Sequence, residues 1–118
     1  MTDSSLEIKD PNYRVWYEPK SHTVYFEGKL RLQPGAYRDI EVLLQKVMDL
    51  EQERIRLHLH DLQYLNSSGL NMLFKFVVAL RKKGSINLAV RASKAIFWHS
   101  KAIANIERFF PSAELELA

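Results

Sequence analysis

Leu57-His58-Leu59-His60-Asp61-Leu62-Gln63-Tyr64-Leu65-Asn66-Ser67-Ser68-Gly69-Leu70 joins a strand to a helix through a short loop. Apolar Leu57 and Leu59 alternate with polar His58 and His60, which is the period of a half-buried strand. Serine and asparagine before a helix supply its N-terminal cap, and the apolar residues that follow return at helical spacing. The segment therefore predicts a strand that leads directly into a helix.

The flanking sequence extends this alternation of strands and helices. A β-hairpin is predicted from two aromatic and β-branched runs around Pro19, and three helices are predicted from apolar residues three and four positions apart. The expected strands cover 13–17, 23–27, 54–60 and 86–90, with a short strand at 114–117. The expected helices cover 40–47, 70–83 and a segment that Ser93 caps and that ends near Phe109.

The order of these elements predicts an α/β fold. Four to five strands would form a mixed sheet, with about three helices packed against it, because a hairpin is followed by strand–helix–strand units. Right-handed crossovers would place consecutive helices on the same side. We expect residues 1–10 to be a flexible N-terminal tail and residues 11–118 to be a single domain.

Composition limits the classes of function. The chain of 118 residues has no cysteine, which excludes disulfides, thiol catalysis and thiolate metal sites. It also has no apolar run long enough for a bilayer and no signal-like N-terminus, which predicts a cytoplasmic protein without membrane contact. Residues 54–108 carry ten basic and two acidic side chains. Nucleic-acid binding is therefore an alternative, although solvated basic side chains explain the excess better.

Asn66-Ser67-Ser68-Gly69 lies where the predicted helix begins. The first backbone N–H groups of a helix have no partner within the helix and favour an anion, so a phosphate on Ser67 would be stabilised there. Gly69 lacks a side chain, so the backbone of another molecule could approach closely. The plainer interpretation is a turn and a helix cap without further function.

The passage from the strand through Asp61-Leu62 to Asn66-Ser67-Ser68-Gly69-Leu70 resembles the signature of STAS domains, the anti-sigma-factor antagonist family. Gly28-Lys29-Leu30-Arg31, Lys83-Gly84 and Ala92-Ser93-Lys94 extend the resemblance over nearly the whole chain. The resemblance implies a non-enzymatic partner switch in transcription regulation or signal transduction, with Ser67 phosphorylated. A histidine-kinase-like serine kinase or anti-sigma factor would be one partner, and a PP2C-type phosphatase would reverse the modification.

Two residues depart from the family pattern. Asn66 stands where an aspartate is usual, and Arg31 replaces an acidic residue of the kinase-facing surface. Both changes make this surface more positive, so we expect a different partner, such as a signalling enzyme of the diguanylate cyclase type. The predicted partner-binding residues are Arg31, Asn66, Ser67, Ser68, Gly69, Met72 and Phe76. Met72 and Phe76 widen the apolar arc of their helix, which fits either a docking patch or core packing.

Other kinds of site have less support. His58 and His60 share a strand face with Arg56, and a metal site there would need a third ligand, so we predict a polar strand surface and no metal. The four glycines form no nucleotide-binding loop, and we predict no cofactor and no catalytic residue. A module that binds a small ligand, and a homodimer, remain open alternatives.

Overall fold

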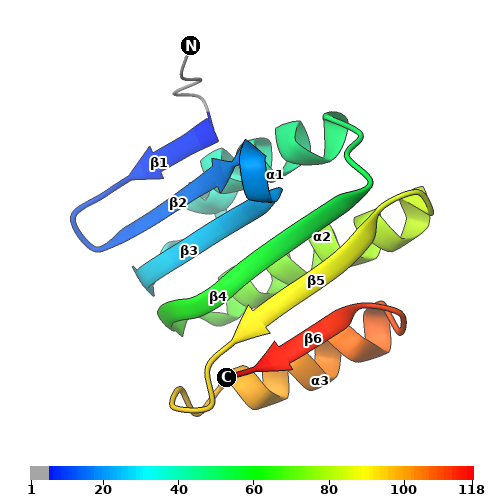
Figure 1. Ribbon diagram of the computed structural model, residues 1–118. Coiled ribbons are helices and arrows are strands. Elements are labelled where there is room, and N and C mark those ends of the chain that lie inside the picture. The colour runs from blue at the N-terminus through cyan, green and yellow to red at the C-terminus, as the bar shows by residue number, and fades with distance from the viewer. Residues whose placement is uncertain (1–5) are drawn as a thin grey trace.

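The computed structural model describes residues 6–118, and these form a six-stranded sheet covered by helices on one side (Figure 1). The strands lie in the sheet in the order in which they occur along the chain. They are β1 (Glu7–Lys9), β2 (Tyr13–Glu18), β3 (Thr23–Leu30), β4 (Arg54–Leu65), β5 (Asn87–Ala92) and β6 (Glu114–Leu117). The helices are α1 (Arg38–Asp49), α2 (Ser67–Lys83) and α3 (His99–Phe109), with the 3-10 turns η2 (Pro19–Ser21) and η3 (Pro34–Tyr37).

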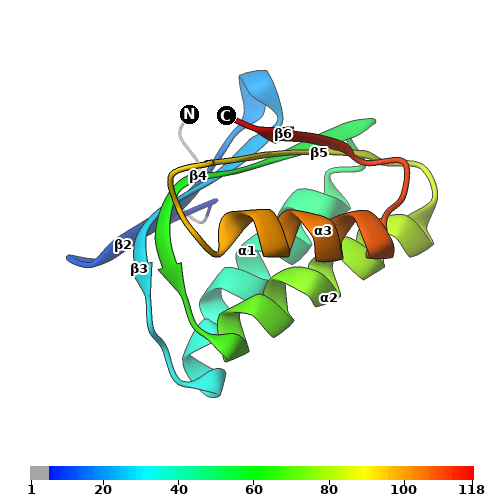
Figure 2. The same ribbon diagram turned by 90° about the horizontal axis from the view of Figure 1, so that it is seen from below.

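The sheet is mixed, as the sequence predicts. β1, β2 and β3 pair in antiparallel fashion, whereas β3, β4, β5 and β6 run parallel to one another. Each parallel step is a crossover through one helix, and all three helices cover the same face (Figure 2). Among residues 6–118, no α-helix covers the opposite face of the sheet, which we call its open face (Figure 2). No helix within residues 6–118 is long and apolar enough to cross a bilayer.

The core lies between the sheet and the helical layer. Ile55, Leu57 and Leu59 of β4 are buried, and the polar residues between them face outward, which confirms the predicted alternation. In α1 the buried positions repeat every three to four residues, which confirms an amphipathic helix. α2 ends at Lys83 and is followed by Gly84, whose φ of 76° is the left-handed conformation that glycine adopts after a helix.

β4 departs from strict alternation in its second half. Its buried residues Leu59, Leu62 and Leu65 are three positions apart instead of two. The pairing with β3 shifts register at two places over this range, so extra residues are inserted in β4. Such bulges turn the side chains that follow to the other face of the sheet.

The structure corrects two predictions from the sequence: the extent of the N-terminal tail and the residue at which α3 begins. Residues 1–5 of the predicted flexible tail lie outside the described residues, but Glu7–Lys9 form β1, held in the sheet by β2. α3 begins at His99, so Ser93 is not its N-cap. Ser93 instead accepts a hydrogen bond at Oγ from the backbone N–H of Ala95, 3.1 Å away, within the loop before the helix.

The imidazole of His99 anchors that loop. His99 is 1% exposed; its Nδ1 accepts from the N–H of Ser93 at 2.9 Å, and its Nε2 lies 2.8 Å from the carbonyl oxygen of Leu62. Both ring nitrogens are satisfied only when Nδ1 carries no proton and Nε2 donates. Burial lowers the pKa of His99 below its usual 6.5, in agreement with this neutral form.

Candidate functional site

The candidate site lies at the edge of the sheet where β3 and β4 end together. These strands are parallel, and Leu30 pairs with Leu65 at their last positions. α2 begins two residues after Leu65, so its N-terminus is held directly beside the end of β3 (Figure 2). Ligand sites of parallel sheets commonly occupy this edge, outside the carboxyl ends of the strands.

Asn66 connects three segments at this edge. Its Oδ1 accepts from the N–H of Gly69 at 3.0 Å, which makes Asn66 the N-cap of α2. Its Nδ2 donates to the carbonyl oxygen of Leu32 at 2.8 Å. Its backbone N–H donates to the carbonyl oxygen of Leu30 at 3.2 Å. The side chain therefore needs both an acceptor and a donor, which an amide has and an ionised carboxylate lacks. This explains physically why asparagine stands here.

Tyr37 completes the network from the far end of η3. Its side chain is 1% exposed, and its hydroxyl lies 2.6 Å from Asn66 Oδ1 and 3.2 Å from the carbonyl oxygen of Leu30. Burial raises the pKa of Tyr37 above its usual 10.0, so the hydroxyl keeps its proton and can donate. Sequence reasoning missed Tyr37 because no local pattern connects it with a residue 29 positions away.

Gly69 has a different role from the predicted one. It is buried inside the first turn of α2, and a Cβ atom built there would overlap the side chain of Leu65 and lie 2.7 Å from the Tyr37 hydroxyl. The close approach that glycine permits is therefore made within the chain, to Leu65 and Tyr37. The predicted contact between Gly69 and the backbone of a partner is corrected accordingly.

Ser67 and Ser68 are accessible at the start of α2. Ser67 is exposed and Ser68 is half-buried. Their N–H groups belong to the first helical turn, which has no acceptor within the helix, while the third N–H, that of Gly69, is taken by Asn66. Ser67 is thus an exposed residue beside backbone donors at the positive end of the helix dipole.

Arg31 lies close to this turn. Its neighbours Leu30 and Leu32 both accept hydrogen bonds from Asn66, so its backbone runs alongside the cap. The Arg31 guanidinium carbon lies 4.6 Å above the ring of Tyr64, a partly exposed residue near the end of β4. The structure therefore brings Arg31, Asn66, Ser67 and Ser68 together and adds Tyr64, which the sequence analysis did not single out.

Met72 and Phe76 do not belong to an exposed surface. They are 5% and 7% exposed and form part of the hydrophobic core, beside α1. Of the two interpretations left open for them, the structure shows core packing. The predicted docking role of Met72 and Phe76 is corrected for this reason.

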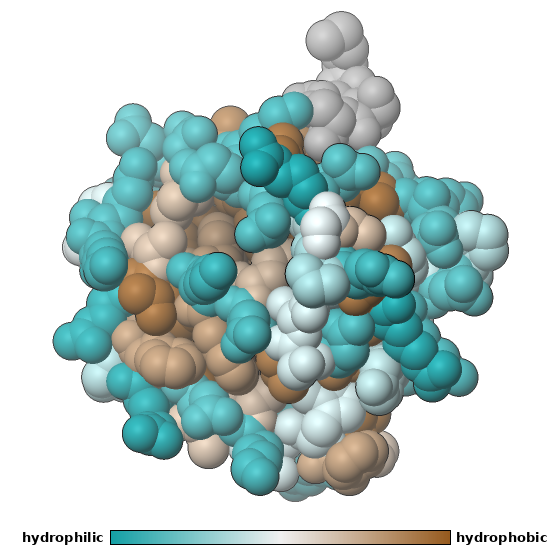
Figure 3. Space-filling view, turned by 180° about the vertical axis from the view of Figure 1, so that it is seen from behind, coloured by the Kyte–Doolittle hydropathy of each residue, from teal (hydrophilic) through white to brown (hydrophobic). Residues whose placement is uncertain are grey.

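The outer side of α2 carries another set of residues, which we call the α2–α3 groove. The groove measures about 460 Å³, and an apolar patch is visible on the helical face of the molecule (Figure 3). Ser67 lies one helical turn before Asn71, at the N-terminal end of the groove. The phenyl rings of Phe74 and Phe109 contact each other with centroids 5.4 Å apart. The lining residues are Asn71, Phe74, Lys75, Val78, Ala79, Lys82 and Phe109.

Comparison with solved structures shows which fold this is. SiaC of Pseudomonas aeruginosa superimposes with a TM-score of 0.67 at 14% sequence identity, over 100% of this chain and 97% of that chain. The chain has a STAS-like fold. A chain in the complex of the P. aeruginosa diguanylate cyclase SiaD with its activator SiaC gives a TM-score of 0.71 at 11% identity, covering 95% and 97% of the two chains. Apo-SiaC from the same organism gives 0.61 at 12% identity, covering 94% and 97%.

No protein-family model matches the sequence, and no curated protein sequence matches it significantly. The likeness to SiaC is therefore one of fold.

Proposed function

We propose that this protein is a non-catalytic partner switch that binds a signalling enzyme and is controlled by phosphorylation of Ser67. The observation that carries the proposal is that Ser67 is exposed at the first position of α2, beside the end of β3. A phosphate would add about 1.5 to 2 negative charges at neutral pH and three strong acceptor oxygens. The first-turn N–H groups of Ser67 and Ser68 would stabilise it, so the fold would be kept while the surface changes.

The fold likeness supports the class of partner. SiaC is named as the activator of the diguanylate cyclase SiaD, and a chain of their complex covers 95% of this chain. We infer that the partner here is also a signalling enzyme of the diguanylate cyclase class. A histidine-kinase-like serine kinase would phosphorylate Ser67 and a PP2C-type phosphatase would remove the phosphate, as the STAS resemblance implies. The switch would act in the cytoplasm.

The α2–α3 groove is the docking surface in this proposal, with Arg31 and Tyr64 at its Ser67 end. The groove offers apolar contacts from Phe74, Val78 and Phe109 and begins next to Ser67. A partner helix or loop seated on it would cover the Ser67 hydroxyl. Phosphorylation would then place a negative charge without a countercharge from the partner in the interface, which commonly costs about 2–5 kcal/mol of binding free energy and lowers affinity at least tenfold.

The alternative of nucleic-acid binding receives less support. Several basic side chains of the positively charged half form ion pairs, with Arg54–Glu114, Arg91–Glu116 and Lys83–Glu51 separated by 3.5, 3.3 and 3.9 Å. A small ligand would need an enclosed, largely apolar cavity. The hollow of about 360 Å³ over Arg54, Arg56 and Arg91 instead lies open on the bare face of the sheet.

The decisive experiment measures partner binding of Ser67 variants. The chain is tested against diguanylate cyclases of its own cell by calorimetry and by cyclic di-GMP production. We expect Ser67→Ala to bind like the unmodified protein and Ser67→Asp to bind at least about tenfold more weakly. Ser100→Asp is the matched control, because Ser100 is also exposed in the first turn of a helix, α3.

Two outcomes would contradict the proposal. One is equal affinity of Ser67→Ala and Ser67→Asp for a partner that binds the chain. The other is the absence of phosphate on Ser67 in peptide mass spectra of the protein from its native cell, under conditions in which the partner changes between its bound and free forms.

A further inference from the structure

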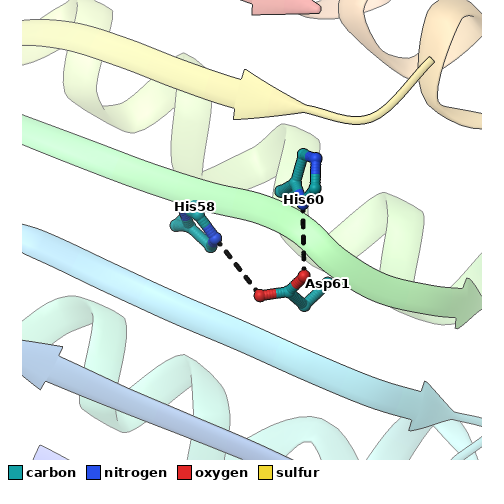
Figure 4. A group of neighbouring side chains, drawn as sticks. All are labelled: His58, His60 and Asp61. Atoms are coloured by element: carbon teal, nitrogen blue, oxygen red, sulfur yellow. Dashed lines mark hydrogen bonds and ion pairs between the residues drawn. The ribbon is translucent and has the colours of Figure 1, made fainter. Parts of the chain in front are cut away.

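A second group of functional side chains lies on the open face of the sheet, away from α2. His58, His60 and Asp61 of β4 meet there, and we call them the His–Asp cluster (Figure 4). The atoms that could bind a metal, one ring nitrogen from each histidine and one carboxylate oxygen from Asp61, all lie within 4.8 Å of one another. The proposed partner switch makes no use of these residues.

A bulge in β4 creates the cluster. Strict alternation would put His58 and His60 on one face of the sheet and Asp61 on the other. In the structure Tyr25 pairs with His58 and Glu27 pairs with Asp61, so two steps along β3 correspond to three along β4. The extra residue turns Asp61 toward the histidines. The third ligand that the sequence analysis found lacking is therefore supplied by the bulge.

The distances in the cluster suit a transition metal. The Asp61 carboxylate lies with Oδ2 3.4 Å from His58 Nε2 and with Oδ1 3.2 Å from His60 Nδ1. Two ligands bound to Zn²⁺ at about 2.0–2.1 Å in a tetrahedron are roughly 3.3–3.4 Å apart. Each of the two His–Asp separations therefore matches that of two ligands on one ion, and the three ligand atoms as a set lie within 4.8 Å of one another. Imidazole ligands favour zinc and its neighbours over magnesium or calcium.

The surroundings of the cluster help to hold the ligands in place. The ring of Tyr25 contacts that of His58 with centroids 4.9 Å apart, and the His58 and His60 side chains are 22% and 34% exposed. Glu27 adds a second negative charge beside Asp61, which offsets the positive charge of Arg56 two positions before His58.

We propose that His58, His60 and Asp61 form a binding site for a divalent transition metal ion, with Zn²⁺ as the best match. Three protein ligands leave a coordination position for water or for a donor atom of another molecule. The site faces solvent on the open side of the sheet, so such a molecule has access. The interpretation without metal is a hydrogen-bonded ion pair between Asp61 and the two histidines.

The test is metal binding by the untagged full chain after treatment with a chelator. Zn²⁺ is titrated by calorimetry, and Co²⁺ is used as a spectroscopic probe whose visible absorption reports its coordination. We expect one ion per chain, saturating at about micromolar concentrations. Absorption typical of nitrogen and oxygen ligands should accompany it. His58→Gln, His60→Gln and Asp61→Asn should each weaken binding roughly tenfold or more.

Matched controls separate the cluster from other ligands of the chain. Glu116→Gln removes a carboxylate from the same face of the sheet, and His22→Asn removes a histidine outside the cluster; both should bind like the unmodified chain. Far-UV circular dichroism without metal checks that each variant is folded. The proposal is overturned if the unmodified chain shows no saturable binding at these concentrations. It is also overturned if folded cluster variants bind as tightly as the controls, because the ion would then be adventitious.

Discussion

Replacing Asn66 with aspartate tests the central geometric argument of the candidate site. Asn66→Asp restores the residue usual in STAS domains, and it keeps the oxygen that caps α2. It removes the N–H group that donates to the Leu32 carbonyl at 2.8 Å and brings a carboxylate oxygen to that place. The resemblance to the family alone would predict a neutral or favourable change. The hydrogen bonds in this structure predict the opposite.

The expected loss follows from the separate contacts. An acceptor left without its partner in a partly buried place costs about 1–3 kcal/mol, and repulsion between two oxygens adds to this. A charge at a helix N-terminus returns about 0.3–1 kcal/mol, and charge-assisted bonds from Gly69 and Tyr37 act in the same direction. We expect a net loss of about 1–2 kcal/mol in the free energy of unfolding, which corresponds to a decrease of roughly 3–12 °C in Tm.

Urea unfolding followed by tryptophan fluorescence and far-UV circular dichroism measures this difference. The matched control is Asn71→Asp, which makes the same chemical change on the exposed side of the second turn of α2 and should alter stability by less than about 0.5 kcal/mol. If Asn66→Asp is as stable as the unmodified chain or more stable, the bond to Leu32 does not explain asparagine at this position.

Two further changes probe the packing around this edge and around α3. Gly69→Ala should lower the free energy of unfolding by about 1–3 kcal/mol, because the added methyl group meets the Tyr37 hydroxyl. The control is Gly35→Ala, which adds a methyl group in open space and should have almost no effect in the same urea titration. Stability should also fall as the pH drops from the unfolded-state pKa of His99, near 6.5, toward its lower folded value, because the unfolded chain takes up the proton first. A protonated Nδ1 of His99 can no longer accept the hydrogen bond from the N–H of Ser93. His99→Gln should therefore make the free energy of unfolding depend less on pH below the unfolded-state pKa. An unchanged slope of stability against pH would show that His99 does not cause the loss.

Much of the fold was predictable because strands and helices follow from local periodicity. The hairpin, α1, α2, the glycine after α2 and β6 all appear where the residue pattern places them. β1 was not predicted, because three residues of an edge strand carry little signal until β2 is present to pair with them. The start of α3 was also misplaced. Ser93 is a good capping residue by itself, but the buried ring of His99 holds the preceding segment as a loop.

The candidate site also combines features that the sequence predicts with features that only the tertiary structure reveals. The sequence by itself determined that a serine would open a helix after a parallel strand, since capping and strand–helix alternation depend on neighbouring residues. Only the tertiary structure decided that Tyr37 holds Asn66, that Met72 and Phe76 are buried, and that a bulge turns Asp61 toward His58. These results depend on which strands pair and in which register, and that choice minimises the free energy of the whole chain rather than of any local segment.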